Sequence, residues 1–153
     1  MRIALACDHR GFPYKATLAG ALGDDGHLVL DLGTHSTDAV DYPDFARAVG
    51  VTVREGRADL GVVVCGSGAG VSIAANKIRG VRAALAHDLF TARQSREDDD
   101  ANVICLGARV VDVAQAVVLV RAFVGARFSG AERHVRRLAK VVALEREELS
   151  GAA

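Results

Sequence analysis

The amino-acid sequence predicts an α/β fold: a Rossmann-like three-layer α/β/α sandwich around a five-stranded parallel sheet. The first observation behind this prediction is that short apolar runs alternate along the chain with longer segments of helical periodicity. The second is that the apolar runs show little polar alternation, as expected for parallel strands that helices cover on both faces. The chain has 153 residues, half of them apolar and a quarter charged, with no visible linker or repeat, so we expect one domain over residues 1–153.

Five apolar runs, each rich in Val, Ile, Leu or Ala, are the predicted strands. They are Arg2–Cys7, His27–Asp31, Asp59–Cys65, Arg82–Ala86 and Asn102–Leu106. Six helices are predicted in the intervals that follow them: Pro13–Leu22, Tyr42–Glu55, Val71–Ile78, Asp88–Glu97, Asp112–Gly125 and Ala131–Leu149. Ligands of such folds bind beyond the carboxyl ends of the strands, near the switch in strand order, so chemistry is expected just after each strand.

The helices have signals of their own. Pro13 suits the opening turn of the first helix, and Gly23 and Gly26 mark its end. Apolar residues three or four apart give the longer helices one apolar face each: Phe45, Val49 and Val53 in the second, Val113, Val117, Val120 and Val124 in the fifth, and Val135, Leu138 and Val142 in the last.

Charge and composition exclude several classes of protein. Lys plus Arg and Asp plus Glu balance at 19 each, so no nucleic-acid or membrane partner is expected from the overall charge. The longest apolar stretches, such as Val113–Val120, are too short to span a bilayer, and the first residues lack the apolar region of a secretory signal. Three widely spaced cysteines are typical of reduced thiols, so we expect a cytoplasmic protein without a disulfide framework or a zinc site. The catalytic residues proposed below need no metal or cofactor, and none is expected.

A polar turn follows the first strand. Within Cys7–Gly11, Asp8 and His9 are titratable residues at a strand–helix junction, as a substrate-facing loop requires. The alternative is structural, with Asp8 capping the next helix and His9 in solvent, because Asp is a common N-cap residue.

The third strand ends in the densest signal, a glycine-rich loop that carries a cysteine. Gly66, Gly68 and Gly70 let the backbone turn sharply and present N–H groups at the start of the next helix, an arrangement that binds anions. The glycine spacing is neither that of a dinucleotide-binding loop nor that of a P-loop, which makes a nucleotide-binding domain a poor fit. Cys65 precedes this loop, where the positive end of a helix favours the thiolate, although buried cysteines are as often packing residues.

Further along the chain, charged residues lie at two places that favour anion binding. Arg109 follows the fifth strand, and Arg133, His134 and Arg137 share one face of the last helix. Such a face is most often simply solvated, but two Arg and a His in this spacing suit a phosphate group. Together with Cys65 as a base and the glycine loop as an oxyanion site, these residues suit the interconversion of an aldose and a ketose phosphate.

The motifs resemble the ribose-5-phosphate isomerase B and galactose-6-phosphate isomerase family over nearly the whole chain. The matching segments are Ala6–Phe12, Asp31–Thr34, Asp41–Pro43, Cys65–Lys77 and Asn102–Arg109, in the family's order and spacing. The resemblance implies a homodimer or a tetramer whose active sites are shared between subunits, with the helix at about 131–149 packing on the partner.

The resemblance also implies roles for individual residues. Cys65 would transfer the proton, Ser67 would assist ring opening, and Gly66, Gly68 and Gly70 would form the anion site. Asp8 and Asn102 would contact the sugar. The phosphate would be bound by His9, Arg109, Arg133, His134 and Arg137.

One position departs from the family pattern. Asp98 stands where these enzymes typically have a histidine that assists ring opening, and an ionised Asp is a poor proton donor at neutral pH. Either the crowded neighbouring acids keep Asp98 protonated and in an acid role, or the substrate needs no ring opening. Ribose 5-phosphate remains one expectation, an open-chain tetrulose 4-phosphate such as erythrulose 4-phosphate is another, and a non-catalytic sugar-phosphate-binding protein is a third.

Overall fold

The computed structural model describes residues 1–150, and strands and helices alternate through them as far as the last two helices, which follow one another directly. The strands are β1 (Arg2–Cys7), β2 (Leu28–Asp31), β3 (Leu60–Cys65), β4 (Ala83–Leu85) and β5 (Val103–Gly107). The helices are α1 (Phe12–Asp24), α2 (Tyr42–Arg54), α3 (Ala69–Ala75), α4 (Leu89–Asp99), α5 (Val113–Gly125) and α6 (Glu132–Ser150). The predicted α/β sandwich with a five-stranded parallel sheet is confirmed.

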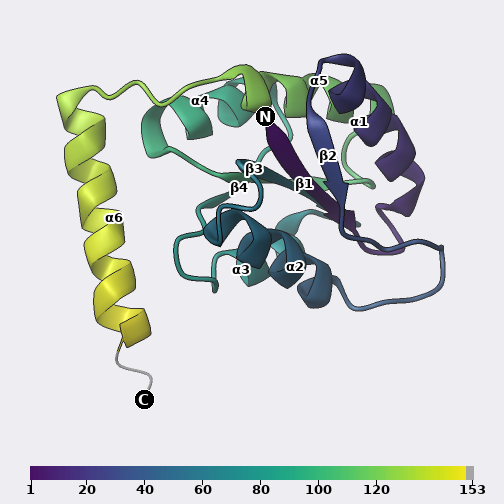
Figure 1. Ribbon diagram of the computed structural model, residues 1–153, viewed down its shortest axis with the longest axis horizontal. Helices are drawn as coiled ribbons and strands as arrows, with labels where there is room; N and C mark the ends of the chain where they lie inside the picture. The colour runs from purple at the N-terminus through teal and green to yellow at the C-terminus, as the bar shows by residue number, and fades with distance from the viewer. Residues whose placement is uncertain (151–153) are drawn as a thin grey trace.

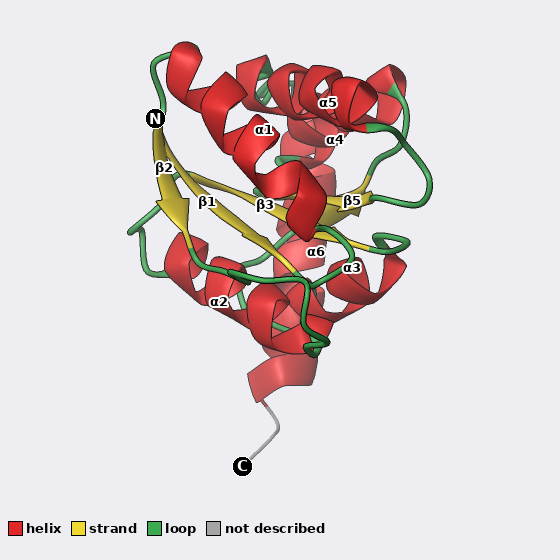
Figure 2. Cartoon of the chain, turned by 90° about the vertical axis from the view of Figure 1, so that its right-hand side faces the viewer, coloured by secondary structure: helices red, strands yellow, loops and turns green. Residues whose placement is uncertain are grey.

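The sheet has the strand order β2-β1-β3-β5-β4, and every pair is parallel. Helices α1, α4 and α5 cover one face, and α2 and α3 cover the other (Figures 1 and 2). Because side chains alternate along a strand, each central strand supplies both cores: Val62 and Val64 pack under α1 and α5, whereas Val63 and Cys65 pack under α2 and α3. The strand order reverses between β1 and β3, so the crevice expected at a switch point lies where Cys7 and Cys65 end their strands.

The observed element boundaries lie close to the predicted ones, with the largest difference at α3. This helix begins at Ala69, two residues earlier than predicted, because Gly68 adopts a positive φ of 79° that starts it directly from the glycine loop. It ends at Ala75, three residues early, because Asn76 turns its side chain toward β4. The Asn76 amide donates to the Ala83 carbonyl at 2.9 Å and accepts from the Ala83 N–H at 2.9 Å.

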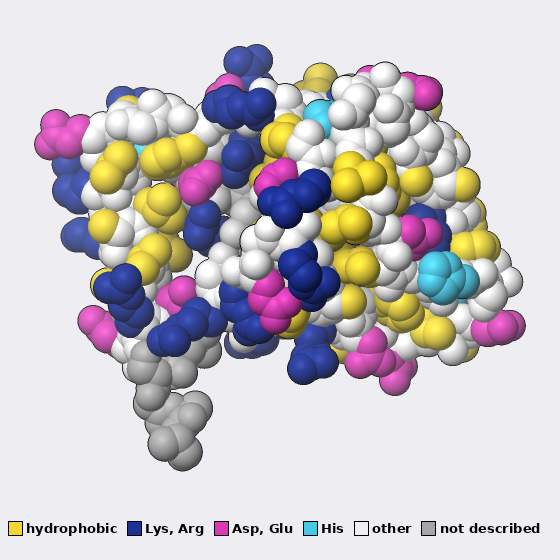
Figure 3. Space-filling model, viewed as in Figure 1, with side chains coloured by type: hydrophobic (Ala, Val, Ile, Leu, Met, Phe, Trp, Pro, Cys, Tyr) yellow, Lys and Arg dark blue, Asp and Glu magenta, His cyan; other side chains and the backbone are white. Residues whose placement is uncertain are grey.

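Helix α6 stands apart from the sandwich (Figure 1). It contacts the rest of the chain through α4 and through Glu145, whose carboxylate accepts from the Gly80 N–H at 2.6 Å. A hollow of about 540 Å³ separates it from β4, and apolar side chains line α6 beside it (Figure 3). Val141 and Leu144 of this helix are 51% and 59% exposed, so its apolar face is largely uncovered within one chain. Over residues 1–150, no helix is long and apolar enough to cross a membrane.

Candidate active site

A cavity of about 300 Å³ opens at the switch point, beyond the carboxyl ends of β1 and β3. Its lining combines the turn after β1, the glycine loop after β3, the residues after β5 and the start of α2. The lining residues are Asp8, Arg10, Tyr42, Cys65, Gly66, Ser67, Gly70, Arg109 and Val110. The structure therefore brings together six residues that the sequence proposes for the site: Asp8, Cys65, Gly66, Ser67, Gly70 and Arg109.

Cys65 is the last residue of β3, and its side chain is only 4% exposed at the inner end of the cavity. Its Sγ accepts a hydrogen bond from the Gly68 N–H at 3.1 Å, and a backbone N–H aimed at sulfur stabilises negative charge there. The other two cysteines are fully buried. Burial raises the pKa of the Cys7 thiol to about 11, and it raises the pKa of the Cys105 thiol as well. Cys7 and Cys105 therefore pack in the two hydrophobic cores, one on each face of the sheet.

The glycine loop fits tightly against its neighbours. A side chain at Gly68 would approach Leu85 Cδ1 to 2.6 Å and the Leu106 carbonyl carbon to 2.8 Å. The Ser67 Oγ lies at the exposed tip and accepts from the Ala69 N–H at 3.3 Å. Glycine is therefore required here both for the positive φ of Gly68 and for the close approach of β5.

Asp8 does structural work and lines the cavity as well. Its Oδ1 accepts the N–H groups of Arg10 and Gly11 at 2.9 and 3.0 Å, which organises the turn before α1. The helix cap itself is Gly11 without a side-chain bond, so the expected alternative of Asp8 as an N-cap is not what the structure has. His9 lies beside the cavity rather than in its lining, and its Nδ1 accepts from the Val40 N–H at 3.3 Å.

Two arginines flank Gly66. An added side chain at Gly66 would meet Arg10 Cγ and Arg109 Cδ, each at 3.7 Å, so the two aliphatic stems lie on either side of this residue. Both arginines are exposed and both line the cavity. Among the described lining residues, Asp8 is the one acidic residue. This excess of positive charge favours an anionic ligand.

Sequence reasoning missed three lining residues: Arg10, Tyr42 and Val110. Arg10 has the signal that singled out Asp8 and His9, since it lies in the same turn after a strand. Tyr42 has none, because its place depends on packing: its ring lies over Gly70, where an added side chain would approach it to 2.8 Å.

Five of the proposed residues lie away from this cavity within one chain: Asp98, Asn102, Arg133, His134 and Arg137. Asp98 lies near the end of α4, which runs back from the carboxyl edge of the sheet to its amino edge. There the Asp98 carboxylate accepts from Gln94 Nε2 at 3.0 Å and lies 3.4 Å from His134 Nδ1. His134 is 4% exposed, and its Nδ1 is also 2.7 Å from Ser129 Oγ, so it joins α6 to α4.

Asn102 lies at the same amino edge, directly before β5. Its side chain accepts from the Arg82 N–H and donates to the Gly80 carbonyl, both at 2.8 Å. Both of its polar groups are thus used to join the start of β4 to that of β5.

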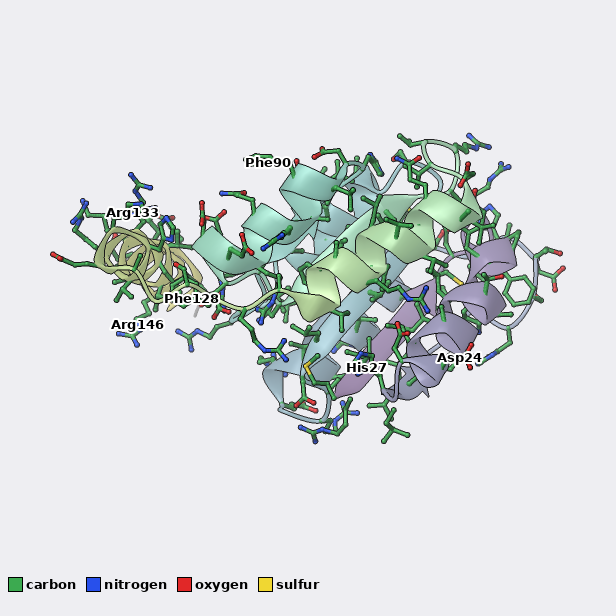
Figure 4. The ribbon with its side chains drawn as sticks, turned by 90° about the horizontal axis from the view of Figure 1, so that it is seen from above. Asp24, His27, Phe90, Phe128, Arg133 and Arg146 are labelled. Atoms are coloured by element: carbon green, nitrogen blue, oxygen red, sulfur yellow. The ribbon has the colours of Figure 1, made fainter. Side chains whose placement is uncertain are left out.

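Arg133 and Arg137 are exposed on α6. Arg133 projects into open space (Figure 4), and Arg137 lines the hollow between α6 and β4. Among residues 1–150, no cluster of three or more His, Cys, Asp or Glu is arranged to hold a metal ion.

Comparison with known proteins agrees with this geometry. The sequence matches the Ribose/Galactose Isomerase family over residues 3–141. It is 40% identical over 144 residues to ribose-5-phosphate isomerase B of Escherichia coli, covering 94% of this chain and 96% of that protein.

Two solved structures are similar throughout. The ribose-5-phosphate isomerase B of Clostridium thermocellum superposes with a TM-score of 0.94 at 42% identity, covering 97% of this chain and 99% of the other. The Mycoplasma genitalium enzyme with bound ribulose-5-phosphate superposes with a TM-score of 0.91 at 41% identity, covering 95% and 97%. The chain therefore belongs to the ribose/galactose isomerase family of aldose–ketose isomerases.

Proposed function

We propose that this enzyme interconverts ribose 5-phosphate and ribulose 5-phosphate, with Cys65 as the residue that moves the proton. The observation that carries the proposal is the convergence of the Cys65 thiol, the glycine loop and two arginines on one cavity at the switch point. Membership of the family and the ribulose-5-phosphate in the Mycoplasma genitalium structure support this class of substrate.

The proton transfer needs one base and a site for negative charge. The Cys65 thiolate removes the proton from C2 of the open-chain aldose, and the C–H electrons form the C1–C2 double bond of an enediolate. The resulting thiol then delivers its proton to C1, while the hydroxyl proton on O2 passes to O1. The N–H groups of the Gly66–Gly70 loop stabilise the oxyanion, and Ser67, exposed at the mouth, assists ring opening.

The phosphate group is held by cations. Arg109 and Arg10 reach the cavity from the same chain, on either side of Gly66. Arg133, His134 and Arg137 would be supplied to the phosphate by a partner subunit, because they lie on α6. The same subunit would bring Asp98 and Asn102 to the sugar from the amino edge of the sheet.

We further propose that the chain forms a homodimer through α6, with a tetramer as the alternative assembly. The uncovered apolar face of this helix, which includes Val141 and Leu144, supports this contact. Light scattering on a sizing column would measure the mass. A monomer that is nevertheless active would refute the shared site.

Incorporation of solvent deuterium tests the isomerase proposal. The purified protein in D₂O is expected to incorporate deuterium into an accepted tetrose, pentose or hexose phosphate, since the proton exchanges on the base during turnover. A sugar-phosphate-binding protein without catalysis would bind the sugar and leave it unlabelled. That result would favour the non-catalytic alternative.

Asp98 favours a second candidate substrate, a tetrulose 4-phosphate such as erythrulose 4-phosphate. Ribose 5-phosphate closes its ring through the 4-hydroxyl, whereas a tetrose 4-phosphate has this oxygen esterified and stays open. The Asp98 carboxylate accepts from Gln94 Nε2 at 3.0 Å and lies 3.4 Å from His134 Nδ1, so no histidine stands at the ring-opening position itself. An enzyme without the acid would therefore retain its activity on the open-chain sugar.

Asp98→His is expected to raise kcat/KM for ribose 5-phosphate by about tenfold or more, because it restores a proton donor. Its kcat/KM for the tetrulose phosphate should not rise. Steady-state kinetics on both substrates would measure this. A wild type that turns over ribose 5-phosphate efficiently and the tetrulose phosphate poorly would refute the open-chain hypothesis.

Arg10→Gln is expected to raise KM for the sugar phosphate roughly tenfold with a smaller effect on kcat, because one charge-assisted contact to phosphate is lost. Arg57→Gln is the control, since Arg57 pairs with Glu55 at 2.8 Å away from the cavity. An unchanged KM in Arg10→Gln would show that Arg109 and the partner's residues suffice.

A further inference from the structure

The histidine at the end of β4 occupies a position that the proposed chemistry does not use. β4 pairs with β5 up to Leu85 and Cys105, and the Ala86 N–H then donates to the Cys105 carbonyl at 3.2 Å. Beyond this point β4 no longer offers a backbone partner to the Gly107 N–H. The imidazole of His87 does so instead, and its Nε2 accepts from Gly107 at 2.9 Å.

Gly107 lies directly behind the cysteine loop. An added side chain there would come within 2.5 Å of the Ser67 carbonyl carbon and oxygen, so the two backbones are in contact. The next two residues complete the attachment: Ala108 N–H donates to the Cys65 carbonyl at 2.8 Å, and Arg109 N–H donates to the Gly66 carbonyl at 2.9 Å. The end of β5 thus supports the loop and also carries Arg109 into the cavity.

We propose that His87 is a positioning residue for the active site: its neutral ring anchors Gly107, and Gly107 holds the Cys65–Gly68 loop and Arg109 in place. The kinetic test of this role rests on the proposed isomerase function, whereas the role itself does not. His87 does not line the cavity and touches no reacting atom. Because Gly107 supplies the hydrogen, Nε2 must be unprotonated and the ring proton must reside on Nδ1.

This anchor is sensitive to acid. Burial holds the pKa of His87 below its ordinary value of 6.5, against the opposing influence of Asp88 in the same turn. The other polar groups facing the residue are the Gly107 N–H from β5 and the Gln115 amide from α5, which donates to the His87 carbonyl at 3.4 Å. Protonation places a hydrogen on Nε2 opposite the Gly107 N–H, so the anchor is present at neutral pH and lost as pH falls through the lowered pKa.

Two substitutions separate the hydrogen bond to Gly107 from the titration of the imidazole ring. His87→Gln keeps an acceptor near the Nε2 position but cannot gain a proton in this range, whereas His87→Leu removes the acceptor. The experiment measures kcat/KM from about pH 5 to 8 for both variants and the wild type. His27→Gln is the matched control, because His27 lies in another hollow, beside Met1 and Arg121.

His87→Leu is expected to lose roughly 10- to 100-fold in kcat/KM at neutral pH, as displaced catalytic groups do. His87→Gln should keep near wild-type activity at neutral pH. As the pH is lowered, its kcat/KM should fall less than that of the wild type and of His27→Gln. A His87→Leu enzyme as active as wild type, or a His87→Gln enzyme with an unchanged acid-side decline, would overturn the proposal.

A second readout needs no turnover. The rate at which iodoacetamide alkylates Cys65 at pH 7 should be several-fold higher in His87→Leu than in wild type or His87→Gln, because a loosened loop uncovers a thiol that is 4% exposed. If no sugar phosphate is turned over, the isomerase proposal fails while this measurement still tests the anchor. Equal alkylation rates in all three proteins would refute it, and if His87→Leu does not fold, the pH profile of His87→Gln decides.

Discussion

Cys65→Ala is expected to lower kcat on the accepted sugar phosphate by about 10³-fold or more, with a much smaller change in KM. The thiol is the base in the proposed proton transfer, and removal of a positioned acid–base group typically costs 10²- to 10⁴-fold. Binding should persist, because Asp8, Arg109 and the glycine loop remain. Steady-state kinetics and calorimetric titration of the sugar phosphate would separate the two effects.

The matched control for this variant is Cys105→Ala. Cys105 is fully buried in the adjacent strand, and burial raises the pKa of its thiol. Its loss should cost stability by creating a small cavity, about 1 kcal/mol, and leave kcat close to wild type. If Cys65→Ala retained full turnover, the thiol would be a packing residue and another base would have to move the proton.

The second large effect is expected at Gly68. Gly68→Ala forces a Cβ onto a residue with a φ of 79° and places it 2.6 Å from Leu85 Cδ1 and 2.8 Å from the Leu106 carbonyl carbon. The left-handed conformation costs roughly 1–2 kcal/mol and the overpacking a further 1–3 kcal/mol. The thermal midpoint should fall by about 10 °C. Activity should fall roughly 10²-fold, because the Gly68 N–H contacts Cys65 Sγ.

Gly26→Ala is the control that measures the cost of backbone conformation without the cost of packing. Gly26 has a φ of 81° but no atom within 4 Å of an added side chain, so only the backbone conformation is penalised. Its thermal midpoint should fall by about 4 °C without loss of activity. Equal effects of the two substitutions would mean that β5 gives way to the new side chain.

Strand positions were predictable because a strand that is buried on both faces consists almost entirely of apolar residues. Leu60–Cys65 contains only apolar residues and glycine, and the structure buries all of them. Helix ends were less predictable, since they depend on contacts rather than composition. α3 ends where Asn76 binds Ala83 of β4, a residue seven positions away that no local pattern connects to it.

The site could be predicted for the residues that lie at or just after the carboxyl end of a strand. Asp8, Cys65 and Arg109 meet because parallel strands end at the same edge, a rule that needs no coordinates. Arg10 carries the same turn signal as Asp8 and His9, but that signal does not show which turn residue lines the cavity and which lies beside it. Asp98 and Asn102 precede the body of the predicted fifth strand, so the same rule places them at the other edge, away from Cys65 of their own chain.

The position of α4 and α6 has a consequence for enzymology. If Asp98, Arg133 and Arg137 reach Cys65 only from a second chain, the number of complete active sites follows the population of associated subunits rather than the total protein. Specific activity should then decline on dilution below the dissociation constant of the dimer and be protected by substrate, which bridges the two chains. The dissociation constant of the dimer would then set the fraction of the protein that is catalytically active at a given concentration.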